Sequence, residues 1–275
     1  MSYLSANQLK QYNDKGFVSP IDIFSKNRAN EIRKEIELIE EKMPGELNKS
    51  GRYNAHLISP LLDDVTHNSK ILDAVQSVIG KNILVCGTTL FIKNANEKGF
   101  VSYHQDAKYI GLKPYNWVTA WVAITDSNEH NGCMRMWSGS HKGSLKNHKQ
   151  MFNKGNLLTR GQTVNNVPTD KTTPLILKAG QMSLHHPMVV HGSDLNKSND
   201  RRIGFVIQSY ISTSVKQVLG KNGVQIARGN DQFRYHNVIK RTSGFLNNDD
   251  IKLKLKENSD LQKIFYRGSE KKGEY

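Results

Sequence analysis

Residues 102–106 read Ser-Tyr-His-Gln-Asp and place His104 two positions before Asp106. Alternate residues of a β-strand face the same side, so a strand here would let both side chains bind one metal ion. A His-x-Asp pair alone is weak evidence, because such pairs arise by chance in a chain with 10 histidines. Two downstream residues make the pattern specific. His191 offers a third ligand, and Arg202 follows it a short strand further along.

Two imidazoles and one carboxylate on one side of a metal leave half of its octahedron open. This ligand set is typical of non-haem Fe(II) oxygenases. The planar guanidinium of Arg202 suits a carboxylate partner, because it can donate two parallel hydrogen bonds to it. The sequence therefore predicts an iron site with an anion subsite beside it.

The pattern around these residues predicts a mainly β domain with flanking helices. Helical patterns cover residues 5–13, 25–43 and 69–79, with Ser5 and Gln8 forming a capping box. Strand-like segments, separated by turn residues, cover residues 83–86, 88–93, 117–124, 133–137, 174–177, 181–184 and 203–211. We expect a double-stranded β-helix (jelly-roll, cupin-like) barrel. The whole chain, 1–275, is expected to form one domain, with a mainly helical part (1–82), a barrel core (83–215) and a C-terminal extension (216–275).

The composition suits an intracellular enzyme. The 275 residues are 37% hydrophobic and 23% charged, which is ordinary for a globular chain with a substantial core. Only two cysteines, Cys86 and Cys133, are present, so a disulfide framework is not expected. The first residues lack the apolar segment of a signal peptide, and no run reaches the ~20 apolar residues that cross a bilayer. We expect a cytoplasmic protein without a membrane partner.

The net charge of +14 favours an anionic partner but does not identify one. Lys and Arg are scattered, and the chain has neither zinc-finger spacing nor an aromatic RNA-binding run. A solvated basic surface explains most of the charge, an anionic small substrate comes next, and nucleic acid is the least expected partner. The sequence makes no prediction of the oligomeric state.

Four segments carry a more specific pattern: Leu4–Val18, His104–Asp106, Asn131–His141 and Gly180–Arg202. Together they resemble the phytanoyl-CoA dioxygenase superfamily of Fe(II)- and 2-oxoglutarate-dependent oxygenases. Residues 131–141 resemble the family's Asn-Gly…Pro-Gly-Ser-His segment, with Ser138 where proline is usual.

The resemblance implies a role for each residue. His104, Asp106 and His191 would bind Fe(II) and carry the catalytic centre, which also uses O2. The distal carboxylate of 2-oxoglutarate would bind Arg202 and Ser193. A Thr-x-Trp pair, Thr119 and Trp121, would help to line the cosubstrate pocket, although both could simply belong to the barrel core. Arg201 is expected on the opposite face of its strand.

Asp106 also bears on the reaction. Halogenating relatives in the superfamily carry Ala or Gly at this position, which leaves room for chloride. The resemblance therefore implies hydroxylation of an unactivated C–H bond, with succinate and CO2 formed from 2-oxoglutarate.

The substrate is the least determined part. The closest patterns are those of small-metabolite hydroxylases, and the leading candidate is an organophosphonate such as 2-aminoethylphosphonate, hydroxylated alpha to phosphorus. The alternative is a free or carrier-bound amino acid or acyl group. Candidate substrate cations are Lys93, Lys108, Arg135 and Arg228, each of which is otherwise a surface charge.

Other readings remain open from the residues alone. A non-catalytic or nucleic-acid-binding member of the fold is one of them. Of the adjacent His185 and His186, at most one can face the site, and a structural imidazole is the expected role for both.

Overall fold

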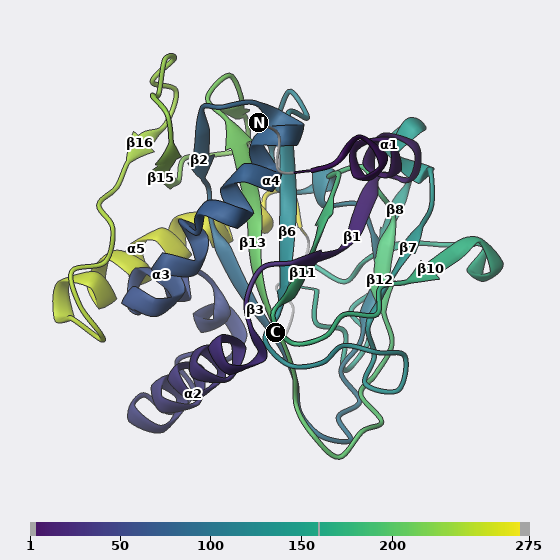
Figure 1. The fold of residues 1–275 in the computed structure, drawn as a ribbon, viewed down its shortest axis with the longest axis horizontal. Helices are drawn as coiled ribbons and strands as arrows, with labels where there is room; N and C mark the ends of the chain where they lie inside the picture. Colours follow the sequence, from purple (N-terminus) through teal and green to yellow (C-terminus); the bar gives the residue numbers. More distant parts are fainter. Residues whose placement is uncertain (1–3, 159, 270–275) are drawn as a thin grey trace.

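The computed structural model describes residues 4–158 and 160–269 (Figure 1). Its helices are α1 (Ala6–Lys15), α2 (Lys26–Lys42), α3 (Pro60–Thr66), α4 (Ser69–Ile79) and α5 (Asn248–Phe265). The Ser5 capping box is present, and Ser25 caps α2 through a hydrogen bond to the Arg28 amide. The helical patterns at residues 5–13, 25–43 and 69–79 are thus confirmed by α1, α2 and α4, because local caps and the 3.6-residue apolar period specify them, whereas α3 was not predicted.

Two sheets form the body of the molecule. The larger has the order β1-β11-β6-β13-β2-β15-β16, with β3 also pairing with β13, and the smaller has the order β10-β7-β12-β4. The strands of the larger sheet are β1 (Phe17–Asp22), β2 (Ile83–Val85), β3 (Thr88–Lys93), β6 (Trp117–Ala123), β11 (Gln181–His185), β13 (Arg202–Ser212), β15 (Gly223–Arg228) and β16 (Asn237–Val238). Those of the smaller sheet are β4 (Val101–His104), β7 (Met134–Trp137), β10 (Thr172–Pro174) and β12 (His191–Ser193).

The chain crosses repeatedly from one sheet to the other. Strands β10, β11, β12 and β13 alternate between the smaller and the larger sheet. Two short ribbons, β5 (Leu112–Lys113) with β14 (Lys216–Gln217) and β8 (His148–Gln150) with β9 (Gln162–Val164), complete the strands. The predicted class is confirmed: the fold is mainly β with flanking helices and is consistent with a double-stranded β-helix.

The strand period divides the core into two layers. Val118, Ala120 and Val122 of β6 belong to one apolar cluster with α2 and α4. Trp121 and Ala123, which alternate with them, pack in another cluster with residues of the smaller sheet. Figure 1 shows α2, α3, α4 and α5 on one side of the larger sheet and β7, β10 and β12 on the other. Odd-numbered residues of β6 are therefore aimed into the space between the sheets.

The structure differs from the sequence prediction in two strands. Strand β4 ends at His104, and Asp106 begins a short 3-10 helix, η3 (Asp106–Lys108). Asp106 therefore does not reach the site as the alternate residue of a strand. The segment predicted at residues 174–177 is displaced, since β10 ends at Pro174. Among the described residues, no helix is long and apolar enough to cross a membrane.

Candidate active site

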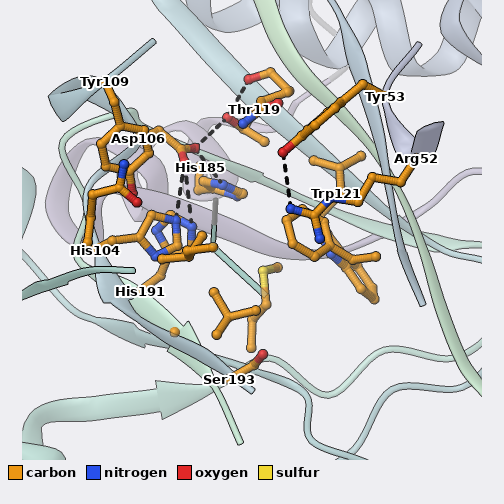
Figure 2. Close-up of a pocket in the computed structure, with 18 of the residues that line it drawn as sticks. Arg52, Tyr53, His104, Asp106, Tyr109, Thr119, Trp121, His185, His191 and Ser193 are labelled. Carbon is orange, nitrogen blue, oxygen red and sulfur yellow. Dashed lines mark hydrogen bonds and ion pairs between the residues drawn. The ribbon is translucent and has the colours of Figure 1, made fainter. Parts of the chain in front are cut away.

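A pocket opens between the two sheets. Figure 2 shows its lining, with His104, Asp106 and His191 on one side and Arg52 and Tyr53 on the other. Its described lining residues are Arg52, Tyr53, Phe91, Val101, His104, Asp106, Tyr109, Thr119, Trp121, Met134, Leu158, Gln162, His185, His191, Gly192, Ser193, Arg202, Val206, Gln208 and Phe265.

The predicted ligands converge in this pocket. His104 and His191 are directly paired across β4 and β12, which brings their rings to a centroid distance of 4.2 Å. The Oδ1 atom of Asp106 lies 3.4 Å from Nε2 of His104 and 4.0 Å from Nε2 of His191. One ligand atom from each of the three residues lies within 4.8 Å of the others, and all three residues are buried.

The second ring nitrogens of the two histidines are already engaged. His104 Nδ1 lies 2.8 Å from the carbonyl oxygen of Ser102, and His191 Nδ1 lies 3.1 Å from that of Val189. A carbonyl can only accept, so each Nδ1 carries the hydrogen and each Nε2 offers its lone pair to the pocket. Burial, with the neighbouring His104, lowers the pKa of His191 to about 3, which keeps that imidazole neutral.

Asp106 supplies the anionic ligand. Its carboxyl is buried among the rings of His104, His185 and His191. Its Oδ2 lies 3.0 Å from the Thr119 hydroxyl, whose single hydrogen is shared between this carboxylate and the Gln208 carbonyl at 2.8 Å. Two neutral imidazole nitrogens and one carboxylate oxygen fit a divalent iron with open positions.

Arg202 is a buried cation aimed at the same cavity. The residue is 1% exposed, and its Nε has no hydrogen-bond partner within residues 4–158 and 160–269. The guanidinium lies over the ring of Trp121, 5.3 Å from its centroid. Burial lowers the pKa of Arg202 to about 10, so the group is still charged near neutral pH. A buried guanidinium without an acidic partner suits the carboxylate of a bound ligand.

The neighbouring predicted residues also lie at the pocket. Ser193, Thr119 and Trp121 line it, although Thr119 and Trp121 serve the core as well. Arg201 points to the opposite face, as expected, and pairs with Glu40 at 2.8 Å.

The four predicted substrate cations do not line the pocket. Lys108 is exposed in η3. Arg135 pairs with Glu129 at 2.6 Å, and Arg228 pairs with Asp73 at 2.6 Å. These arginines are already neutralised outside the cavity, so the structure gives no support to substrate contacts by them.

Lys93 differs from the other three cations because it is buried. It lies behind Ser193, which lines the pocket. Its Nζ donates to the Ser193 hydroxyl at 2.7 Å, to the Gly132 carbonyl at 3.4 Å and to the Asp194 carbonyl. Burial, together with the nearby Arg202, lowers the pKa of Lys93 to about 6.

Sequence reasoning missed Arg52 and the residues from the C-terminal part. Arg52 ends a 3-10 helix, η1 (Lys49–Arg52), and Phe265 ends α5. Both line the pocket, although they lie far from the metal motif in the sequence. No periodicity or spacing marks them, because only the tertiary fold brings them there.

One of the two adjacent histidines reaches the site. His185 lines the pocket, and its Nε2 lies 3.7 Å from Oδ2 of Asp106. In the described part of the chain, neither of its ring nitrogens has a hydrogen-bond partner. His186 points away and contacts the rings of Tyr12 and His141. Strand β11 ends at His185, and His186 is the first residue after it.

Comparison with known proteins places this geometry in a family. The family model described as phytanoyl-CoA dioxygenase matches residues 12–204. A probable alpha-ketoglutarate-dependent hypophosphite dioxygenase of Stutzerimonas stutzeri is 26% identical over 234 residues, covering 78% of this chain and 81% of that protein. The peroxisomal phytanoyl-CoA dioxygenase of Rattus norvegicus is 26% identical over 223 residues, covering 72% and 66% of the two chains.

A solved structure supports the same assignment. The non-heme monooxygenase ThoJ, in its apo form, superposes with a TM-score of 0.83 at 27% identity, covering 94% of this chain and 97% of that one. Its nickel complex gives a TM-score of 0.77 at 26% identity. Together with the converging His104, Asp106 and His191, these likenesses identify the chain as a member of the phytanoyl-CoA dioxygenase family and as an Fe(II)- and 2-oxoglutarate-dependent dioxygenase.

Proposed function

We propose that the enzyme hydroxylates a small anionic metabolite, with Fe(II) held by His104, Asp106 and His191. The observation that carries this assignment is the pair of Nε2 atoms left free beside the Asp106 carboxylate. Bound iron, with O2 and 2-oxoglutarate, supplies the oxidising power for attack on an unactivated C–H bond.

In this proposal Arg202 and Ser193 bind the distal carboxylate of 2-oxoglutarate. The guanidinium provides two donors in one plane, and the hydroxyl provides a third. The Arg202 guanidinium stacks on the Trp121 ring, which orients its two donor groups before the ligand binds. Thr119 holds Asp106 in place, and the surrounding apolar walls exclude water from the reacting C–H bond.

Hydroxylation is favoured over halogenation because Asp106 fills the ligand position. Its carboxylate leaves no room for a halide there. We therefore expect turnover to be independent of chloride and the product to gain one oxygen atom.

Arg52 supports an anionic substrate. It is 6% exposed, and its guanidinium lies 5.2 Å from the ring centroid of Phe91. Its Nη2 donates to the Tyr53 hydroxyl at 3.1 Å and to the Leu157 carbonyl at 2.7 Å, while its Nε has no partner among the residues that the structure describes. All these partners are neutral, so an anion entering the pocket would be the first to offset the charge.

The balance of charge in the pocket favours binding of a second anion besides 2-oxoglutarate. Its described lining contains two guanidiniums, those of Arg52 and Arg202, and one carboxylate, Asp106, which faces the metal. One dianionic 2-oxoglutarate would engage Arg202 and the metal, and would leave Arg52 for the substrate. Figure 2 shows Arg52 across the pocket from the triad. A substrate held by Arg52 would therefore extend toward the metal.

An organophosphonate is our first candidate for this anion. Its tetrahedral oxyanion suits a guanidinium, and its adjacent CH2 would be the hydroxylated carbon. The similarity to a probable hypophosphite dioxygenase supports a phosphorus oxyanion. The described lining has no carboxylate besides Asp106 for an amine, so phosphonates with and without the amino group, such as 2-aminoethylphosphonate and ethylphosphonate, should be compared.

The second candidate is a carrier-bound acyl group. The similarity to phytanoyl-CoA dioxygenase and the aromatic lining contributed by Tyr53, Tyr109 and Phe265 favour it. A succinate-release screen against phosphonates, amino acids and acyl carriers separates the two classes. Turnover of the acyl carrier alone would discard the phosphonate.

Replacing Arg52 by glutamine is expected to raise the KM for the anionic substrate about 10- to 100-fold, the effect of losing one hydrogen-bonded charge. The Kd for 2-oxoglutarate should stay within about twofold. The measurement is steady-state succinate release, with product mass spectra showing one added oxygen. Arg135→Gln is the matched control, because Arg135 already pairs with Glu129 outside the pocket. A rise in the Kd for 2-oxoglutarate with no change in substrate KM would assign Arg52 to the cosubstrate instead.

A further inference from the structure

Lys93 lies directly behind the proposed 2-oxoglutarate subsite. It is opposite Arg202 in the register of β3 and β13, and its side chain is fully buried. Its ammonium reaches three oxygen atoms, those of Ser193, Gly132 and Asp194. It is not one of the residues that line the pocket.

Lys93 Nζ has three hydrogen-bond partners, and an ammonium group has three donors. Two of the three partners are backbone carbonyls, which only accept, and the third is the Ser193 hydroxyl at 2.7 Å. In its ammonium form Lys93 has three donors and no acceptor, so in that form Ser193 must accept from it. The hydroxyl hydrogen of Ser193 is then free to point elsewhere, and Ser193 lines the pocket.

The carbonyls that hold Lys93 are themselves fixed. Gly132 adopts a φ of +71°, and a Cβ at this position would collide with the backbone of Asp194. The turn of residues 131–133 therefore packs closely on the residues that follow Ser193. This contact holds the ammonium at one place relative to the hydroxyl.

We propose that Lys93 is a positioning residue that turns the Ser193 hydroxyl into a donor for the distal carboxylate of 2-oxoglutarate. This inference rests on the proposed subsite of Ser193 and Arg202. A neutral amine would donate to the two carbonyls and accept from Ser193, which would withdraw the donor from the pocket.

The charge state of Lys93 fits this role once the ligand is bound. In the free pocket, burial and Arg202 lower the pKa of Lys93 to about 6. A carboxylate beside Ser193 and Arg202 stabilises the ammonium form. The donor role therefore becomes strongest in the cosubstrate complex.

Calorimetric titration of 2-oxoglutarate into Ni(II)-loaded protein tests the proposal. Lys93→Met and Ser193→Ala should each raise the Kd about 10-fold, the effect of one charge-assisted hydrogen bond. The double variant should bind within about twofold of Ser193→Ala alone, because both changes remove one interaction. In turnover assays, Lys93→Met should raise the KM for 2-oxoglutarate and leave kcat nearly unchanged. Lys98→Met, at an exposed lysine, is the matched control.

An analogue separates positioning from damage to the fold. 2-Oxopentanoate carries a methyl group in place of the distal carboxylate, so its Kd should be the same for wild type and Lys93→Met. Equal weakening of both ligands, or effects of Lys93→Met and Ser193→Ala that add in the double variant, would overturn the proposal. Lys93→Gln, which keeps an amide donor, replaces Lys93→Met if that variant does not fold. If Ser193→Ala and Arg202→Lys both leave the Kd unchanged, the proposed subsite itself is wrong.

Discussion

Replacing His104 by alanine is expected to abolish oxygen-dependent decarboxylation of 2-oxoglutarate, with a loss of more than about 10³-fold. Loss of an outer hydrogen-bond partner of a ligand already costs roughly 10–100-fold, and loss of the ligand itself should cost more. The Nδ1 bond to the Ser102 carbonyl shows that the His104 ring is oriented to present Nε2. The measurement is succinate release from the Fe(II)-loaded protein.

His130→Ala is the control for this variant, since His130 is an exposed histidine outside the pocket. It should retain the activity of the wild type. An unchanged thermal midpoint for the metal-free His104→Ala protein would show that the loss is not due to unfolding. Full activity in His104→Ala would remove this residue from the metal site.

Replacing Arg202 by lysine is expected to raise the KM for 2-oxoglutarate about 10- to 100-fold and to lower kcat less. Lysine keeps the charge, but it loses the planar pair of donors and the stacking on Trp121. The ratio of the two kinetic constants distinguishes lost ground-state binding from lost chemistry.

Arg201→Lys gives the matched comparison one position away. Arg201 pairs with Glu40 on the other face of the strand, so this variant should bind 2-oxoglutarate as the wild type does. The opposite pattern, a tolerant Arg202 and a sensitive Arg201, would contradict the proposed subsite.

The sequence predicted those site residues whose place in the fold is determined by a strand. His104, His191 and Arg202 each lie on or at the end of a strand, and strand pairing carries them into one pocket. The motif spacing predicted them. The conformation at Asp106 was predicted wrongly, because a turn beginning after His104 cannot be distinguished from a continued strand by a His-x-Asp pattern alone.

The positive charge of a residue in the sequence was a poor guide to whether it contacts the substrate. Arg135 alternates on β7 with Met134 and Met136, both buried, so the strand period already places it on the other face. Arg52 could not be predicted, because a 3-10 turn carries it and only the packing of the turn brings it to the pocket. Long-range packing, which leaves no local pattern, likewise determines the place of Phe265.

A crystal structure of the protein with Fe(II) and 2-oxoglutarate, grown without oxygen, tests the proposed centre most directly. The expected result is one metal bound by Nε2 of His104, Nε2 of His191 and a carboxylate oxygen of Asp106. By analogy with His and carboxylate ligands of other first-row ions, each distance should be about 2.0–2.2 Å. The distal carboxylate of 2-oxoglutarate should pair with Arg202. A metal bound by a different set of residues, or a distal carboxylate held away from Arg202, would contradict the account.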